Sequence, residues 1–196
     1  MLLSYCRAIL ELSKYCHHWK RGNRERNVEA LEALLTRRSI RSYTEQPVDD
    51  KEIDMLLHAA MAAPSAMDEQ PWHFVVIRDR KQIERIHAAH PHASMLSQAR
   101  VVIAVCGDTT KEHYPGYWVV DCSIATTHLL IAAHARELGA VWLGVYPRQE
   151  RMDMLRDILH LPSHIHPLSL VAIGHPAEQK GPADRFNAER VHKDTW

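Results

Sequence analysis

The segment between Tyr117 and Pro147 constrains the fold most, because it predicts a long helix, a stop, a strand and a turn in that order. No proline or glycine occurs from Trp118 to Leu138, and alanines are interleaved there with leucine and isoleucine, which favours a helix. Apolar and small residues fall on more than one side of this helix, so we expect it to be buried on several sides. Gly139 is expected to end it as the C′ residue with a positive φ, since glycine takes that conformation without strain.

Residues 140–146 are then predicted to form a buried strand that ends at Pro147. The strand contains Gly144, which is informative because the chain has only 7 glycines among its 196 residues. A glycine weakens a strand and marks either a β-bulge or a place where another group must approach the backbone closely. Taken alone, Gly144 favours a bulge, and the choice depends on the rest of the chain.

The other apolar patterns complete a mixed α/β chain. Further helices are predicted at residues 28–36, 51–63, 79–89 and 149–159. Further strands are predicted at residues 72–77, 101–106 and 168–174. Asn27 is expected to cap the first helix. The polar tail, residues 178–196, lacks a core pattern and is expected to lie on the surface or around a partner chain.

Length and composition favour a single domain at residues 28–196, preceded by a peripheral N-terminal arm at residues 1–27. The 24 basic and 24 acidic residues balance, which gives no support for nucleic acid or an anionic membrane surface as a partner. No apolar run approaches the length that spans a bilayer. The four cysteines form no CxxC pair, and Cys106 and Cys122 are expected to be inert core thiols. These features predict a cytoplasmic protein.

Several familiar sites are missing from the sequence. It contains no GxGxxG after a strand, no GxxxxGK[ST], no GxSxG and no HExxH motif. Its 15 histidines include two clusters, at residues 87–92 and 160–166, but neither has a nearby cysteine or a convincing carboxylate partner. We therefore expect no metal site.

Two segments carry groups that could bind an anionic ligand. Arg37, Arg38 and Arg41 surround Ser39 at the end of the first helix, where guanidinium groups could bind phosphate bidentately and the hydroxyl could add a bond. The alternative is a solvated charged rim. Residues 64–71 form a proline-bounded loop with available backbone donors, and the alternative there is a plain connection.

Together these segments resemble the nitroreductase family of flavin enzymes, and most closely its compact members, over residues 28–196. The resemblance is carried by the order and spacing of residues 37–41 (RRSIR), 63–72 (APSAMDEQPW) and 139–147 (GAVWLGVYP). Asp121 and Arg185 also fit. The resemblance implies a three-layer α/β/α fold with a mostly antiparallel central sheet, built as an interlocked homodimer with the long helix as its central packing element.

The resemblance also implies FMN at the dimer interface, with NADH or NADPH as the electron donor. The residues implied to contact FMN are Arg37, Arg38, Ser39, Arg41, Pro64, Ser65, Ala66, Asp68, Gln70, Trp142, Leu143, Gly144 and Arg185. Those from Pro64 to Gln70 would come from the partner chain, and Arg185 would return from the tail as a second phosphate ligand. Leu143 and Gly144 would offer backbone contacts at the reactive edge of the flavin. No catalytic side chain is implied.

The implied function is an FMN-dependent oxidoreductase that passes electrons from NAD(P)H to a small oxidising substrate by a ping-pong hydride mechanism. Nitroaromatics, quinones and flavins all qualify as substrates. The alternatives are a non-enzymatic flavin-binding or interaction protein, a specialised flavin enzyme of the same fold and, remotely, a metal-binding stress protein. Asp68 stands where the family commonly has asparagine. We hypothesise that Asp68→Asn raises the flavin reduction potential, unless Asp68 faces solvent.

Overall fold

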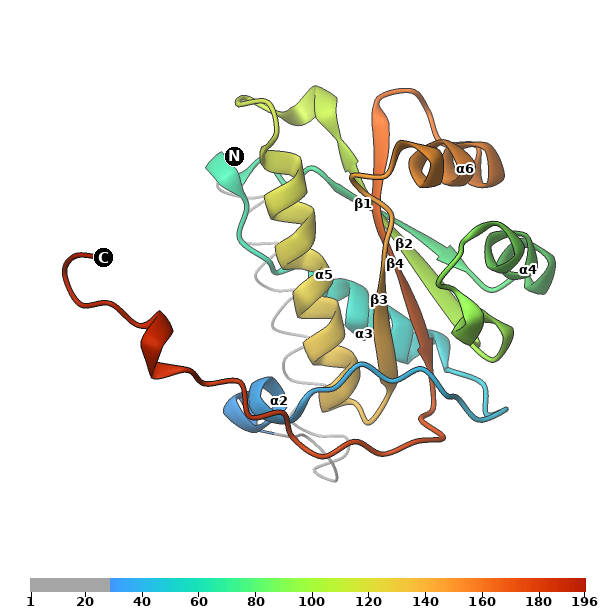
Figure 1. Ribbon diagram of the computed structural model, residues 1–196. Coiled ribbons are helices and arrows are strands. Elements are labelled where there is room, and N and C mark those ends of the chain that lie inside the picture. Colours follow the sequence, from blue (N-terminus) through green and yellow to red (C-terminus); the bar gives the residue numbers. More distant parts are fainter. Residues whose placement is uncertain (1–28) are drawn as a thin grey trace, which may run out of the picture.

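The computed structural model describes residues 29–196, which form a four-stranded sheet covered by helices on both faces (Figure 1). The strands are β1 (Trp72–Ile77), β2 (Val101–Asp108), β3 (Gly139–Gly144) and β4 (Ile165–Gly174). Their order is β1-β2-β4-β3, and every neighbouring pair is antiparallel. The helices are α2 (Ala30–Thr36), α3 (Asp50–Met61), α4 (Arg80–Ala89), α5 (Tyr117–Ala135) and α6 (Gln149–Leu159). The predicted α/β fold with an antiparallel sheet is confirmed.

The sheet separates two hydrophobic cores, because side chains alternate between the two faces of each strand. In β2, Val101 and Ile103 belong to the core shared with α3 and α5. Val102 and Ala104, on the same strand, belong to the core shared with α4 and α6. Figure 1 shows these helix pairs on opposite sides of the sheet, so the domain has three layers. Burial on both faces is why β2 reads as a continuous apolar run.

The helix α5 packs across one face of the sheet and contacts β2, β3, β4 and α3. Among residues 29–196 it alone is long and apolar enough to cross a membrane by length and composition, so the expectation that no such run exists was wrong. Leu129 and Ala133 are fully buried on its sheet side. Tyr117 and Val120, on the opposite side, remain 49% and 51% exposed. α5 is therefore a core helix whose second apolar side is not covered by the described chain.

The connection from α5 to β3 differs from the prediction. Glu137, and not Gly139, takes the left-handed conformation after the helix, with φ of 58°. Gly139 instead begins β3, where a Cβ atom would lie only 2.6 Å from Cγ2 of Ile40. The Ile40 N–H donates to the carbonyl oxygen of Ala140 at 3.1 Å. Gly139 therefore lets residues 37–41 pack closely along the outer edge of β3.

The strand β3 is also shorter than predicted, since it ends at Gly144 and not at the residue before Pro147. The β3–β4 register runs without a shift as far as the Gly144–Ser169 pair. This register excludes the alternative of a bulge at Gly144. A Cβ atom at Gly144 would have no heavy atom within 4 Å, so open space lies beside this strand end.

The structure describes the first helix of the domain and the C-terminal tail, but not the residues before position 29. The first described helix begins at Ala30, with Glu29 at its N-cap position. The predicted cap, Asn27, and the N-terminal arm lie outside the described residues. The tail leaves β4, passes beside α2 and extends away from the sheet (Figure 1). Its large side chains are exposed, including Phe186 at 81% and Trp196 at 99%.

Candidate functional site

Three guanidinium groups gather at the C-terminal end of α2. Arg37 is the C-cap residue of that helix and is partly buried, Arg38 follows it, and Arg185 returns from the tail. Burial and then the positive charges of Arg185 and Arg38 lower the pKa of Arg37. Among residues 29–196, none of the three forms an ion pair with a carboxylate. Like charges held together without a counter-ion favour binding of an anion.

Residues 37–41 are fixed in place by the tail as well as by β3. The Ser39 carbonyl oxygen accepts a bond from Lys180 Nζ at 2.9 Å. The Arg41 N–H donates to Glu178 Oε1 at 2.5 Å, and Lys180 pairs with the same carboxylate at 3.0 Å. The bonds from Arg41 and then Lys180 lower the pKa of Glu178. The tail therefore closes over the arginine segment at this edge of the sheet.

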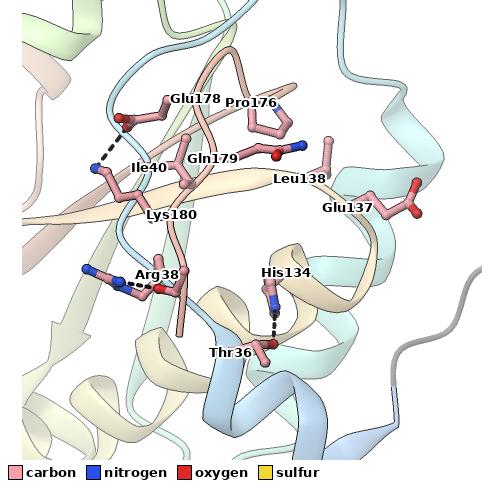
Figure 2. Close-up of a pocket in the computed structure, with 11 residues that line it drawn as sticks. Thr36, Arg38, Ile40, His134, Glu137, Leu138, Pro176, Glu178, Gln179 and Lys180 are labelled. Carbon is pink, nitrogen blue, oxygen red and sulfur yellow. Dashed lines mark hydrogen bonds and ion pairs between the residues drawn. The ribbon is translucent and has the colours of Figure 1, made fainter. Parts of the chain in front are cut away.

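A cavity of about 450 Å³ lies between this segment, the C-terminal end of α5 and the tail (Figure 2). It is lined by Thr36, Arg38, Ile40, His134, Glu137, Leu138, Pro176, Glu178, Gln179, Lys180 and Gly181. Arg38 donates to the Gly181 carbonyl oxygen. Thr36 and His134 form a hydrogen bond of 2.8 Å, which a dashed line marks in Figure 2. Arg38 lines this cavity, but Arg37 and Ser39, which were also predicted near the phosphate group, do not.

The outer edge of β3 presents backbone groups beside the arginine segment. Because the Ala140 oxygen faces this edge, the alternating pattern of an antiparallel strand turns the backbone groups of Trp142 and Gly144 the same way. The Trp142 side chain packs partly on the α5 core. The Leu143 side chain is buried in the α4–α6 core and its backbone polar groups face β4, so Leu143 could touch a ligand only through van der Waals contact of its backbone. The open space beside Gly144 suits close approach by a ligand.

The proline-bounded loop has a strained backbone. Met67, Asp68 and Gln70 have φ of 49°, 58° and 48°, in a region that residues other than glycine rarely occupy. The Ser65 hydroxyl oxygen accepts from the Gln70 N–H at 3.0 Å, and Asp68 Oδ1 accepts from Gln70 Nε2 at 2.7 Å. Asp68 is exposed. Such strain costs about 1–3 kcal/mol per residue and is typical of functional loops.

Asp121 anchors this loop to the first turns of α5. Its side chain is buried, and Oδ1 accepts from the Ala66 N–H at 3.0 Å. Its Oδ2 is buried and has no hydrogen-bond partner among the described residues. Burial, followed by the charges of Glu69 and Glu112, raises the pKa of Asp121 against the opposing effect of the Ala66 bond. The sequence had placed Asp121 in the family pattern without a role, because spacing alone does not show its contact with the loop.

A single chain does not bring the two halves of the predicted site together. The loop meets α5 at Asp121, whereas Thr36, next to Arg37, meets α5 at His134. Positions 121 and 134 are thirteen residues apart, or about 20 Å along a helix. The loop also leads into β1, while residues 37–41 lie along β3, at the opposite edge of the sheet.

Other reactive groups are confined to the interior. Cys106 and Cys122 are free thiols that are fully buried, and burial raises the pKa of Cys106 to about 12 and that of Cys122 further. Within residues 29–196, no three His, Cys, Asp or Glu side chains converge to hold a metal ion.

Two further residues, His90 and Arg151, contact the predicted site. From the sequence, His90 was considered only as a member of a histidine cluster, and Arg151 was not singled out. Arg151 Nη1 donates to the Gly144 carbonyl oxygen at 2.8 Å, and His90 Nε2 lies 3.1 Å from the same oxygen. Their positions in the chain carry no signal for this contact. Only the packing of α4 and α6 beside the end of β3 reveals it.

A three-layer antiparallel α/β domain with clustered arginines at one sheet edge defines the class of this protein, and its sequence defines the family. The chain belongs to the Nitroreductase family, whose sequence model matches residues 34–175. The predicted family and fold are thus confirmed.

Individual relatives agree over most of the chain. A protein of Methanothermobacter thermautotrophicus named "Putative NADH dehydrogenase/NAD(P)H nitroreductase" is 47% identical over 169 residues, which cover 86% of this chain and 88% of the relative. A crystal structure of a protein with the same name from Parabacteroides distasonis is 41% identical, with a TM-score of 0.83, over 85% of this chain and 98% of that one. A structure from Desulfovibrio desulfuricans that contains FMN is 30% identical, with a TM-score of 0.75, over 86% and 98% of the two chains.

Proposed function

We propose that two copies of this chain bind FMN between them and pass electrons from NADH or NADPH to a small oxidising substrate of the nitroaromatic, quinone or flavin class. The mechanism is ping-pong, because donor and acceptor use one open face in turn. Membership of the Nitroreductase family makes the chain an NAD(P)H-dependent oxidoreductase. The free, buried thiols of Cys106 and Cys122 support a cytoplasmic location.

The observation that carries the proposal is the separation of the two half-sites. The arginine segment lies near one end of α5 and the proline-bounded loop is anchored near the other. A two-fold axis perpendicular to α5 near its middle would place the two copies of the helix antiparallel, so each loop would face the arginines of the other chain. The exposed apolar side chains of Tyr117 and Val120 lie on the side of α5 that such a dimer would cover.

The residues of this chain fit the chemistry of FMN. A phosphate group would supply the negative counter-charge that Arg37, Arg38 and Arg185 lack among the described residues. The open space at Gly144 allows a flat ring to approach the backbone of β3. When bound, the flavin supplies the chemistry that accepts a hydride and donates electrons.

The remaining predicted contacts have supporting roles in this proposal. The cofactor-binding set also comprises Ser39, Arg41, Trp142 and Leu143 from the same chain, and Pro64, Ser65, Ala66, Asp68 and Gln70 from the partner. Arg41 would place a positive charge where a reduced flavin carries negative charge. The Asp68 carboxylate is exposed in the single chain, so solvent would screen its charge toward the flavin more than it screens a buried charge.

The direct test is the visible spectrum of the purified protein, followed by anaerobic addition of NADH and NADPH separately. We expect a flavin spectrum that bleaches with at least one donor. A flavin spectrum that bleaches with neither would favour a non-enzymatic binding protein. A colourless protein that takes up no FMN would overturn the proposal.

The shared site has its own test in mixed dimers. Arg37→Met breaks the arginine half and Gln70→Ala breaks the loop half, so each variant alone should bind FMN weakly. A dimer of one Arg37→Met chain and one Gln70→Ala chain keeps one site with both halves intact, and we expect one tightly bound FMN per dimer. If each site belonged to one chain, the same mixture would contain no tight site. A different tag on each chain, used in two successive purifications, isolates the mixed dimer. The mixed dimer of Arg37→Met with wild type has one tight site under either arrangement and is the reference for occupancy.

A further inference from the structure

Two side chains from the α4–α6 layer converge on the carbonyl oxygen of Gly144. Arg151, in the first turn of α6, donates from Nη1 at 2.8 Å. His90, the C-cap residue of α4, places Nε2 at 3.1 Å. One backbone oxygen thus accepts two hydrogen bonds, and one of them comes from a full positive charge. We name this arrangement of His90, Arg151 and Gly144 the carbonyl clamp.

The imidazole of His90 is fixed in one protonation state. The ring is buried, and its Nδ1 accepts the N–H of His92 at 3.2 Å. Nδ1 therefore carries no proton, and Nε2 is the donor to Gly144. Burial, and then the charges of Arg151 and His92, lower the pKa of His90 against the opposing effect of the Gly144 bond. The ring is thus neutral near pH 7 and acts as a fixed donor.

The charge of Arg151 is not neutralised locally. Among residues 29–196 it forms no ion pair, and its Nε atom is buried without a hydrogen-bond partner. Arg156, further along α6, also has a buried Nε without a hydrogen-bond partner, but its charge is paired with Asp153 at 2.8 Å. The guanidinium of Arg151 is therefore directed at the peptide of Gly144, next to the open space at the end of β3.

We infer that His90 and Arg151 are positioning residues that set the backbone and the electrostatic potential at the flavin-facing end of β3. This inference rests on the proposed function. Because the clamp occupies the Gly144 oxygen, the N–H of Gly144 is the backbone group left for a ligand at the outer edge. The charge of Arg151 acts through the same peptide and favours the electron-rich, reduced cofactor over the oxidised one.

The test in the presence of cofactor is a redox titration of FMN-loaded variants. Arg151→Met removes the charge, and we expect the affinity for reduced FMN relative to oxidised FMN to fall about tenfold, which lowers a two-electron potential by about 30 mV. Arg151→Lys retains the charge and should shift this ratio by less than about threefold. Arg156→Met, on the same helix, is the matched control and should leave the ratio unchanged.

Three outcomes of the titration would overturn the inference. They are a shift in Arg151→Met no larger than that in Arg156→Met, equal shifts in Arg151→Met and Arg151→Lys, or a rise in potential on loss of the charge. Arg151→Gln also removes the charge and serves as the second variant if Arg151→Met fails to fold.

A second measurement tests the clamp without cofactor. In FMN-free protein, hydrogen exchange of the peptide spanning residues 143–147 should quicken in His90→Phe and in Arg151→Met, and not in Arg156→Met. Unchanged exchange in both clamp variants would show that the bonds do not hold this strand end. If wild-type protein bound no FMN while hydrogen exchange still quickened in both clamp variants, the proposed function would be wrong. The carbonyl clamp would then have only a structural role at the end of β3.

Discussion

Replacing Arg185 by glutamine should weaken FMN binding without weakening the fold. Arg185 is exposed in the tail, yet its charge is among the causes that lower the pKa of Arg37, so the two guanidinium groups share one electrostatic environment. In the absence of an anion, this proximity is repulsive. With a phosphate group between them, both charges become favourable. The same substitution therefore has opposite effects on the two states.

The expected magnitudes follow from the exposure of each side chain. A hydrogen bond to a charged group contributes about 1.5–3 kcal/mol. For the exposed Arg185 we take the lower end, so Arg185→Gln should raise the Kd for FMN about tenfold, whereas Arg37→Met, at a partly buried position, should raise it about 100-fold. Relief of the repulsion should leave the stability of FMN-free protein unchanged or raise it by about 0.5 kcal/mol.

The assay combines FMN titration by fluorescence with thermal unfolding of the FMN-free protein. Arg190→Gln is the matched control, because Arg190 lies in the same tail, is exposed and does not contribute to the lowered pKa of Arg37. Inorganic phosphate should raise the Tm of wild type more than that of Arg185→Gln, and added salt should reduce the difference. Equal FMN affinity in Arg185→Gln and Arg190→Gln would refute the reasoning, as would a Tm that falls together with affinity.

Two glycine substitutions distinguish a position next to a ligand site from a position packed inside the fold. The buried carboxyl group of Asp121 makes the stability of the fold depend on pH. Gly144→Ala meets no atom within 4 Å and should leave Tm unchanged while weakening FMN binding, whereas Gly174→Ala places Cβ 2.9 Å from the ring of Tyr43 and should cost about 2 kcal/mol. Equal Tm values for the two variants would contradict this. For Asp121 the folded pKa is raised, so wild type loses stability as pH rises from the unfolded pKa to the folded pKa. Asp121→Asn keeps an acceptor for the Ala66 N–H, and the Tm of this variant relative to wild type should rise as pH rises above the unfolded pKa. A constant difference in Tm would show that the charge is not costly.

The elements with strong local signals were predictable from the sequence. β1 and α6 have the predicted bounds, because each combines an apolar pattern with flanking turn residues. The end of α5 was not predictable in detail. Gly139 looked like a helix stop, but the chain uses Glu137 there and reserves the glycine for close packing against Ile40. That contact joins residues about 100 positions apart, which no local pattern can show.

Some residues of the candidate site were likewise predictable from the sequence, and others were not. Arg37, Arg38 and Ser39 were recognisable from their chemistry, and the fold brings Arg185 into their environment across the length of the domain. The carbonyl clamp was not recognisable, because His90 had the appearance of one surface histidine among 15. Its burial and its contact with Gly144 arise only when α4 and α6 pack on the sheet.

In the proposed dimer, packing of a second copy against α5 explains both the apolar composition of this helix and the separation of the two half-sites. A helix packed on a sheet needs one apolar side, yet α5 is apolar enough all round to match the composition of a membrane-spanning helix. A helix buried between its own sheet and a second subunit needs the same composition, because both of its sides leave water. Each end of α5 also carries one half of the site, near Asp121 and near His134. Burial of the uncovered side by a second copy would therefore be the same event that completes the cofactor site.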